Sequence, residues 1–265
     1  MFACPQPVLT VPPPSRPAGV LPCVVALALA LTAGIASAAC TDAPARRVNW
    51  YGCAQPGADL GNIDLRGAVL EYTDFSAARF GGAQLEDADF GRSRLAAADF
   101  TRATLSNARF VAATLDAANF SGARLDGARL ERAQAAGANF TGADLSAANA
   151  YQAQLGKAVL DGARLDGARL EQAVLDDARF DGASLRSARL QRASAERTRF
   201  TGADLAGARL DGARLDGADF SGADLTGASL VGARIDGARF DGARLGDCIW
   251  TDRRRCRPGS VGQCD

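Results

Sequence analysis

Residues 208–220 read ARLDGARLDGADF, with a large apolar residue at Leu210, Leu215 and Phe220. A helix brings apolar residues to one face every 3.6 residues, and a strand does so every second residue. A strict spacing of five fits neither pattern over more than a few residues. The stretch therefore indicates a backbone that is neither an ordinary helix nor an ordinary strand.

The spacing of five continues over most of the chain. From Leu60 to Leu245 there are 38 such centres, and two residues before each centre the chain has Ala in 34 cases. The centres are Leu, Phe or Ile, with three alanines as exceptions: Ala135, Ala150 and Ala195. One short unit repeated in register over this length predicts a solenoid, in which each unit stacks on its neighbours.

The distribution of Phe and Leu predicts how many pentads make one coil. Eight of the 11 Phe centres lie at multiples of twenty: Phe80, Phe100, Phe120, Phe140, Phe180, Phe200, Phe220 and Phe240. A second column in steps of twenty contains only leucine: Leu65, Leu85, Leu105, Leu125, Leu145, Leu165, Leu185, Leu205, Leu225 and Leu245. Twenty residues therefore return the chain to the same column, so the 191 residues from 57 to 247 make about 9.5 coils of four sides.

In such a coil the centre residue and the Ala point inward, and the other three residues face water. Gly two places after a centre, as at Gly212 and Gly217, suits a corner that needs a positive φ. The three alanine centres remove large side chains from the core, which predicts soft spots there. We also expect a bulge or a kink near Ala150 and Ala195.

The chain resembles the pentapeptide-repeat family, whose units begin with Ala, then Asp or Asn, then Leu or Phe. Four matching units are Ala58-Asp59-Leu60, Ala88-Asp89-Phe90, Ala143-Asp144-Leu145 and Ala223-Asp224-Leu225. The resemblance covers residues 57–247 and implies an all-β, right-handed quadrilateral β-helix. The chain departs from the family in the residue before the centre, which is Arg 15 times and Asp or Asn only 12 times.

Both ends differ from the repeat. Residues 1–39 end in an apolar run followed by small residues, which predicts a secretory signal peptide and a periplasmic or secreted protein. Lipidation of Cys40 is the alternative. Residues 40–56 and 248–265 are expected to cap the coil, with Trp50, Tyr51 and Trp250 covering its ends. A homodimer through one end of the solenoid is a further expectation.

The cysteines of the chain after residue 39 gather at these two ends. Exported proteins oxidise such pairs, so we expect Cys40 to pair with Cys53 and Cys256 with Cys264. Cys248 would then stay reduced at a small inward position. A zinc site is the weaker alternative, because no two cysteines are spaced as CxxC and the chain has no His.

One side of the predicted coil is richer in arginine than the others. Its residues form a candidate binding face for a protein or an anionic surface: Arg92, Arg109, Arg129, Arg132, Arg169, Arg189, Arg192 and Arg209. An ordinary solvated face with interleaved ion pairs is the alternative, because exposed pairs contribute only about 0–1 kcal/mol.

No catalytic, metal or cofactor site is predicted, and no small-molecule substrate is expected. The chain lacks His and a phosphate-binding glycine loop, and its carboxylates recur with the repeat. We therefore predict a non-catalytic exported rod that serves as a structural or protein-binding scaffold. The family resemblance implies an alternative, a DNA mimic that binds a type II topoisomerase and protects against quinolones. That role needs a strongly acidic surface, whereas residues 57–247 contain 27 acidic and 23 basic side chains. Binding of nucleic acid itself is not expected.

Overall fold

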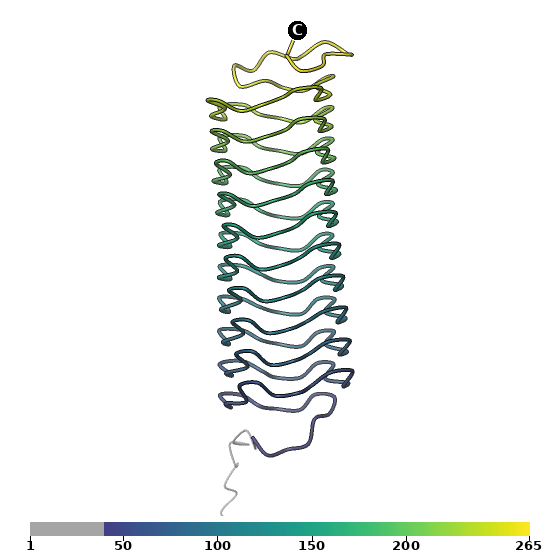
Figure 1. Ribbon diagram of the computed structural model, residues 1–265, viewed down its shortest axis with the longest axis vertical. Coiled ribbons are helices and arrows are strands. Elements are labelled where there is room, and N and C mark those ends of the chain that lie inside the picture. The colour runs from purple at the N-terminus through teal and green to yellow at the C-terminus, as the bar shows by residue number, and fades with distance from the viewer. Residues whose placement is uncertain (1–39) are drawn as a thin grey trace, which may run out of the picture. The chain divides into compact units, whose positions relative to one another are not determined.

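The computed structural model describes residues 40–265, which form one continuous coil stacked into a rod (Figure 1). The predicted signal peptide lies outside the described residues. A turn recurs every five residues, and between turns one residue makes a parallel bridge to the residue twenty places further on. These bridges run from Asn49↔Val69 to Ser229↔Ile249.

The β-structure consists of isolated bridges. Within residues 40–265 there is no helix, and no strand is longer than one bridging residue. The reason is geometric, because only three residues separate one turn from the next. Stacking many short sides nevertheless gives a β-solenoid, since each bridge continues into the coils before and after it.

Backbone hydrogen bonds hold neighbouring coils in register. In the pentad around Leu210, the N–H of Arg209 donates to Ala188 O of the preceding coil at 2.9 Å, and the N–H of Leu210 donates to Ser229 O of the next at 2.7 Å. The N–H of Gly212 also bonds to the next coil, at 2.9 Å, and that of Ala213 closes the turn onto Leu210 O at 3.0 Å. Only the N–H of the first turn residue is left without a backbone partner in this scheme.

Asp or Asn before the centre satisfies that remaining N–H. Asp74, for example, accepts the backbone N–H of Ser76 at 3.0 Å through Oδ1, an Asx turn. Each of the twelve Asp or Asn residues at this position between residues 57 and 247 makes the same bond: Asp59, Asp64, Asp74, Asp89, Asp99, Asn119, Asn139, Asp144, Asn149, Asp204, Asp219 and Asp224. The polar residue of the repeat is therefore part of the turn.

The second turn residue has a positive φ, as predicted for Gly212 (+66°) and Gly217 (+67°). The same conformation is found where the residue has a side chain, as at Ala77 (56°) and Arg192 (58°). A residue with a Cβ adopts this region at some cost, which explains why Gly is frequent there.

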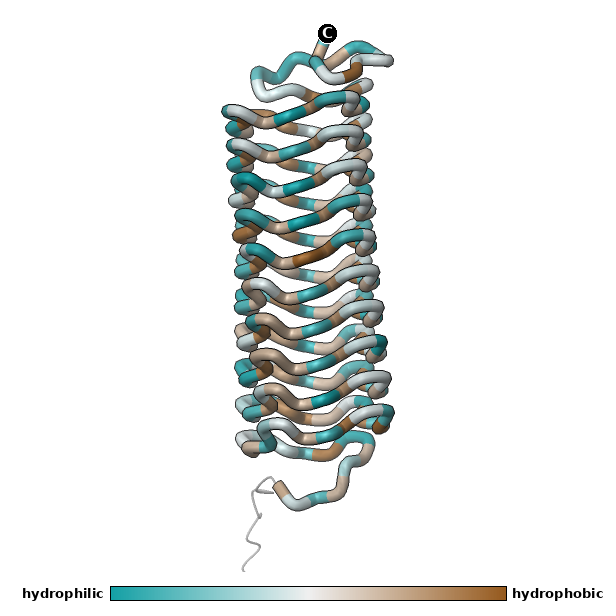
Figure 2. The backbone as a smooth tube through the Cα atoms, viewed as in Figure 1, coloured by the Kyte–Doolittle hydropathy of each residue, from teal (hydrophilic) through white to brown (hydrophobic). Residues whose placement is uncertain are grey.

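Four columns of centre residues fill the core. We number the sides by their centres: side 1 contains Phe80 and Phe100, side 2 Leu85, side 3 Phe90 and side 4 Phe75. The eight Phe and ten Leu predicted for sides 1 and 2 are all buried. Figure 2 shows that apolar segments recur at the same places in successive coils.

Phe rings stack along side 1 and meet side 3 across the core. Phe80 and Phe100 are parallel with ring centroids 4.7 Å apart, and Phe90 of side 3 meets each of them edge to face at 5.7 Å. Sides 1 and 3 therefore face one another. Stacked rings on side 1 are 4.7 Å apart at Phe80–Phe100 and 5.1 Å apart at Phe180–Phe200, close to the spacing of paired β-strands.

Two of the alanine centres border an internal apolar cavity. It measures ≈ 10 Å³ and is lined by Ala135, Ala150 and the leucines around them. The expected bulge or kink near Ala150 and Ala195 was wrong, because turns and bridges continue in register through both sites. Backbone bonds between coils do not depend on the size of the centre side chain, so its loss leaves a void and no change in backbone path.

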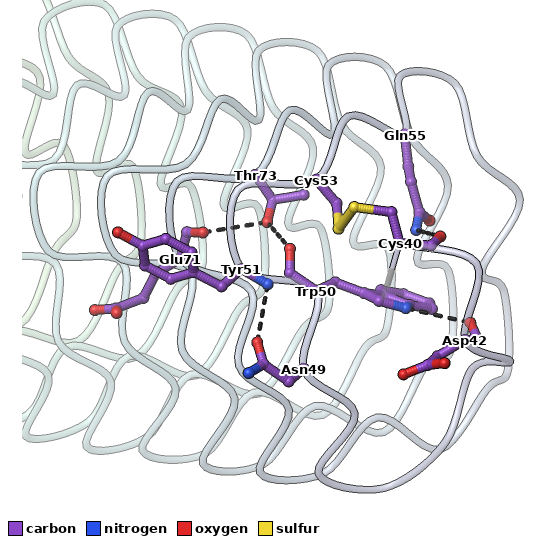
Figure 3. The surroundings of a disulfide bond; sticks show 9 residues. All are labelled: Cys40, Asp42, Asn49, Trp50, Tyr51, Cys53, Gln55, Glu71 and Thr73. Atoms are coloured by element: carbon purple, nitrogen blue, oxygen red, sulfur yellow. Dashed lines mark hydrogen bonds between the residues drawn. A yellow bond between two sulfur atoms is a disulfide. The ribbon is translucent and has the colours of Figure 1, made fainter. Parts of the chain in front are cut away.

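Residues 40–46 cover part of the first coil (Figure 3). The Cys40–Cys53 disulfide, with Cα atoms 5.5 Å apart, holds this segment against Trp50, which is 1% exposed. The indole N–H of Trp50 donates to Asp42 O at 3.2 Å, and its ring lies 6.2 Å from Phe75. Trp50 thus caps the core as predicted.

Tyr51 does not cap the coil, contrary to our expectation. It is 49% exposed and packs on Tyr72 of the next coil, with ring centroids 5.4 Å apart. Tyr51 is the first turn residue after the Trp50 centre, a position that points outward. The regular coil also begins earlier than residue 57, because Asn49 and Ala54 already form parallel bridges.

The C-terminal tail folds back over the last coil. Antiparallel bridges join Arg244 to Val261 and Ile249 to Arg255, and a second disulfide links Cys256 to Cys264. Trp250 is partly buried against Phe240, with ring centroids 5.2 Å apart. Cys248 is a buried free thiol, as expected. Among the described residues, no helix has the length and apolar character needed to cross a membrane.

Candidate binding face

The arginines predicted to form a binding face lie on side 3 or in the turns that follow it. Parallel bridges stack Arg169, Arg189 and Arg209 directly along the rod. We call this surface the side-3 face; its aromatic and basic residues are Tyr51, Tyr72, Arg92, Arg109, Arg129, Arg132, Tyr151, Arg169, Arg189, Arg192 and Arg209.

All three tyrosines of the chain lie on the side-3 face. Tyr51 and Tyr72 are exposed, and the guanidinium carbon of Arg92 lies 5.4 Å from the centroid of the Tyr72 ring. Further along the rod, the hydroxyl of Tyr151 donates to Gln172 Oε1 at 3.3 Å. Tyr and Arg are enriched at protein binding surfaces, so their joint position distinguishes this side from the other three.

Sequence reasoning noted the arginines and missed the tyrosines as a group. The signal was present, because positions 51, 72 and 151 each follow a side-3 centre by one or two residues. The sequence alone favours the N-terminal cap for Tyr51, because this residue lies between Cys40 and Cys53. Placing every outward residue by its column would have put all three on one corner.

A groove of ≈ 390 Å³ begins beside Tyr151 and extends along the next three coils. Four arginines and four acidic or amide side chains line it: Arg169, Arg189, Arg192, Arg209, Glu171, Gln172, Gln191 and Asp211. We call the three less exposed of the last four, Glu171, Gln191 and Asp211, its floor. Four basic groups face two acidic ones, a difference of +2, so the groove favours a negatively charged ligand.

The arginines of this groove contact carboxylates through Nε. Arg189 Nε lies 2.8 Å from Glu171 Oε1, and Arg169 Nε lies 3.7 Å from Glu171 Oε2. Arg209 Nε lies 3.4 Å from an oxygen of Asp211. Elsewhere most pairs use the terminal nitrogens, as in Arg199 Nη2 to Asp181 at 2.8 Å. The terminal N–H groups in the groove thus make no hydrogen bond to residues 40–265 and remain available.

Buried oxygen atoms without a hydrogen-bond partner lie beneath these arginines. Within residues 40–265 they include Glu171 Oε2, Gln191 Oε1 and Asp211 Oδ2, one on each of three successive coils. The Glu171 side chain is 8% exposed. Two of these oxygens lie near an arginine without accepting a hydrogen bond, Glu171 Oε2 at 3.7 Å from Arg169 Nε and Asp211 Oδ2 at 3.4 Å from Arg209 Nε. Buried acceptors usually have a hydrogen-bond partner, so this floor can accept further donors.

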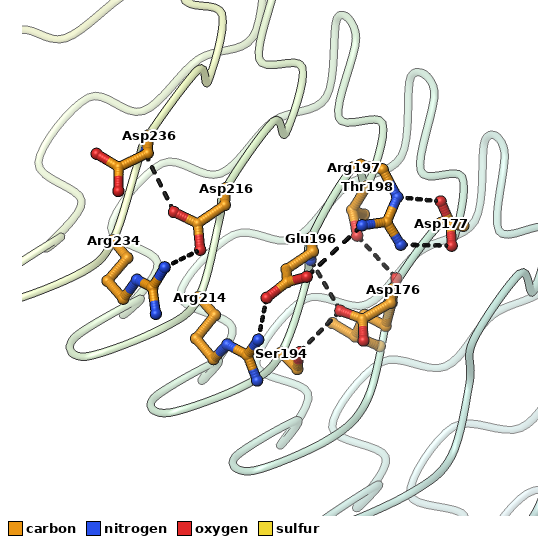
Figure 4. A network of polar contacts seen from close by, with 11 residues as sticks. Asp176, Asp177, Ser194, Glu196, Arg197, Thr198, Arg214, Asp216, Arg234 and Asp236 are labelled. Atoms are coloured by element: carbon orange, nitrogen blue, oxygen red, sulfur yellow. Dashed lines mark hydrogen bonds and ion pairs between the residues drawn. The ribbon is translucent and has the colours of Figure 1, made fainter.

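The remaining titratable groups form part of the turns. The Arg66 guanidinium hydrogen-bonds to Asp64 and lowers the pKa of that carboxyl to about 2. Figure 4 shows polar contacts along side 4, where Asp176, Glu196 and Arg214 connect successive coils. Among the described residues, no group of three or more His, Cys, Asp and Glu side chains is arranged to hold a metal ion.

The family model for pentapeptide repeats matches the chain in overlapping copies from residue 57 to residue 242. The chain belongs to the pentapeptide-repeat family. The matched residues lie within the regular coil, and the two disulfides lie outside them.

Solved structures of the family are similar to this chain. HetL from the cyanobacterium Nostoc sp. strain PCC 7120, a pentapeptide repeat protein involved in heterocyst differentiation regulation, is 31% identical with a TM-score of 0.55. The match covers 76% of this chain and 92% of HetL. QnrB1, a plasmid-mediated fluoroquinolone resistance protein, is 23% identical with a TM-score of 0.39, over 74% of this chain and 90% of its own. A search of curated proteins gives no match.

Proposed function

We propose that this pentapeptide-repeat protein is a non-catalytic, exported rod that acts as a scaffold and binds a partner along its side-3 face. The observation that supports this role most is the gathering of all three tyrosines and of the incompletely bonded arginines on one side. A rigid rod displays such a row at fixed spacing. HetL, the relative with the higher identity here, is named for a role in regulation, which fits a binding function.

The cysteines support export. Cys40–Cys53 and Cys256–Cys264 close the two ends of the coil, and disulfides of this kind persist in oxidising compartments. A signal peptide over residues 1–39 would deliver the chain there, with Cys40 at or next to the new N-terminus.

The finer form of the solenoid is part of the proposal. The twenty-residue spacing of the bridges supports a quadrilateral coil of four pentads, about 9.5 coils over residues 57–247. The right-handed sense follows from the family resemblance.

A homodimer through the C-terminal end fits the way in which the last coil is covered. The tail pairs with sides 2 and 3 through Leu245 and Trp250, whose N–H groups donate to Ser260 O and Arg254 O at 2.8 Å. Ile235 of side 4 is only partly buried and lacks a backbone bond to the tail among the described residues. Unpaired solenoid edges of this kind are surfaces for a second chain.

DNA mimicry is not favoured. The 23 basic side chains of residues 57–247 nearly balance the 27 acidic ones, whereas imitation of duplex DNA needs a strong excess of acid.

Cell fractionation tests export. We expect the full chain, expressed in a bacterium with an oxidising periplasm, to appear there with its N-terminal segment removed and two disulfides formed. Intact-mass measurement reports both changes. A cytosolic, uncleaved product would contradict export.

Site-specific photo-crosslinking tests the binding face. A photoreactive amino acid at Gln172, in the turn after side 3, is expected to capture a partner that mass spectrometry identifies. The matched control places the same group at Arg102, an exposed residue on the opposite corner. Equal capture from both positions would contradict a dedicated side-3 face.

A further inference from the structure

The arginines of the side-3 groove form a ladder with a fixed repeat. Parallel bridges link Arg169 to Arg189 and Arg189 to Arg209, so their backbones are one coil apart. Stacked rings in the same coils give that rise as 5.1 Å for Phe180–Phe200 and 4.9 Å for Phe200–Phe220. Side 3 thus places one arginine backbone about every 5 Å along the rod axis. The side chains of Arg169 and Arg189 both reach Glu171, and that of Arg209 reaches Asp211.

Each rung combines a free donor with a buried acceptor. The terminal N–H groups of Arg169, Arg189 and Arg209 make no hydrogen bond to residues 40–265. Next to them, Gln191 Oε1 accepts no hydrogen bond, and neither do Glu171 Oε2 and Asp211 Oδ2, which lie 3.7 and 3.4 Å from an arginine Nε. A complementary ligand must therefore supply negative charge for the guanidinium groups and N–H or O–H donors for the floor.

The end of the groove at Tyr151 presents an aromatic ring in place of an arginine. The phenol ring is partly buried, and its hydroxyl and the side-chain N–H of Gln152 both donate to Gln172 Oε1, at 3.3 and 3.0 Å. These bonds fix the ring beside the row of arginines. A fixed aromatic ring next to planar polar side chains is suited to the apolar face of a sugar.

Hydroxyl groups distinguish a glycan from an acidic peptide. The carboxylate side chains of an acidic peptide supply negative charge but no O–H donor at neutral pH, whereas a pyranose unit has hydroxyl donors for the buried oxygens as well. A uronic acid adds one carboxylate per sugar, which can accept two N–H bonds from a guanidinium.

We propose that this groove binds an acidic polysaccharide with one carboxylate per sugar, which lies parallel to the rod axis. Its carboxylates bind Arg169, Arg189 and Arg209, its hydroxyls donate to the oxygens of the floor, and one ring packs on Tyr151. The proposal rests on the proposed function, because it assigns the chemistry of the partner to the side-3 face. Export of the chain would bring it to surface glycans.

The test uses oligogalacturonides of defined length and the full chain, with binding measured by calorimetry. The variant Arg169→Gln/Arg189→Gln/Arg209→Gln is expected to weaken binding at least tenfold. The matched control, Arg179→Gln/Arg199→Gln/Arg239→Gln, removes three arginines from the opposite side 1 and is expected to bind as the unmodified protein does. Circular dichroism checks that both variants fold. An equal loss in both would overturn the proposal, because it would report net charge only.

Further probes separate the contributions. Tyr151→Ala should weaken binding several-fold and Tyr151→Phe much less, since the ring contacts the sugar and the hydroxyl only helps to hold the ring in place. Fully methyl-esterified oligogalacturonides should not bind, because they lack the carboxylates. Tighter binding of polyglutamate would overturn the glycan proposal in favour of an acidic protein, and the absence of oligogalacturonide binding would also overturn it. Export is measured separately by fractionation. A chain that stays in the cytosol but binds oligogalacturonides would contradict the proposed function and still support the glycan site.

Discussion

The carboxylate of Asp176 accepts the backbone N–H of Glu196, one coil further along the rod, at 2.9 Å (Figure 4). This N–H belongs to the first turn residue, which the bonds between coils leave without a backbone partner. Four more acidic residues cap the next coil in the same way, namely Asp116, Asp161, Asp166 and Asp216. None of the five turns that receive this bond has an Asp or Asn of its own before the centre. An Asp or Asn before the centre and an acidic residue one coil earlier are therefore alternative acceptors for this N–H.

Asp176→Ala is expected to lower the free energy of unfolding by about 1 kcal/mol, because it removes the acceptor for the Glu196 N–H and for the Ser194 hydroxyl. Asp176→Asn should cost much less, since the amide oxygen can still accept. Urea unfolding followed by circular dichroism measures both. Equal losses for Ala and Asn would show that charge is what matters.

Asp236→Ala is the matched control. Asp236 occupies the same turn position in the last coil, where no further regular coil offers an N–H to its carboxylate. We expect its replacement to change the unfolding midpoint little. A loss as large as that of Asp176→Ala would contradict the role assigned to the bond between coils.

Sequence reasoning predicted the inward residues because their identity is restricted. The column of Leu165 contains only leucine, for example, and all of its members are buried. The role of the acidic residue after the centre was not predicted, because its partner lies twenty residues away and belongs to the backbone. The signal was in the sequence, since Asp166 precedes by twenty residues a turn that lacks Asp or Asn. The cavity near Ala150 was predictable from the small centre residue. The straight backbone around it was not, because it depends on backbone hydrogen bonds between coils, which do not depend on side-chain identity.

Acid should destabilise the rod through its Asx turns. Hydrogen bonds from the Ser221 hydroxyl and N–H hold the pKa of Asp219 below its usual value, and Ser76 does the same for Asp74. A lowered pKa in the folded state means that the stabilisation is complete above the unfolded value of about 3.9 and is lost as pH falls through the folded value. The urea midpoint should therefore stay constant from neutral pH to about 5 and fall below about 4.

Asp219→Asn should reduce that dependence on pH. Asn119 shows that an amide oxygen can accept the same turn N–H, from Ser121 at 3.1 Å, so the variant is expected to fold. The measurement compares urea midpoints at pH 7 and pH 3 in both proteins. An unchanged difference between the two pH values would exclude Asp219 as a contributor.

Two neighbouring alanines should respond in opposite ways to enlargement. Ala150 is a centre beside the internal cavity, between Leu130 and Leu170 of its column, so Ala150→Leu is expected to raise stability by about 1 kcal/mol. Ala148 fills the small inward position, where Ala148→Leu would collide with adjacent coils and cost about 1–3 kcal/mol. Thermal unfolding of both variants measures the difference. A stabilising Ala148→Leu would contradict the assignment of the two inward positions.

Cys248 should be chemically silent while the protein is folded. Its side chain is fully buried in the last coil, and burial raises the pKa of the thiol to about 12, so the reactive thiolate is scarce at neutral pH. Iodoacetamide at pH 8 is expected to leave the peptide that contains Cys248 unmodified in native protein and to alkylate it after unfolding in guanidinium chloride. Mass spectrometry of each cysteine peptide measures this, with Cys256 and Cys264 labelled only after reduction. Cys248→Ala should fold with little loss, because the neighbouring coils accept Ala at this position. Rapid alkylation of Cys248 in the native protein would show that the C-terminal tail does not seal the last coil.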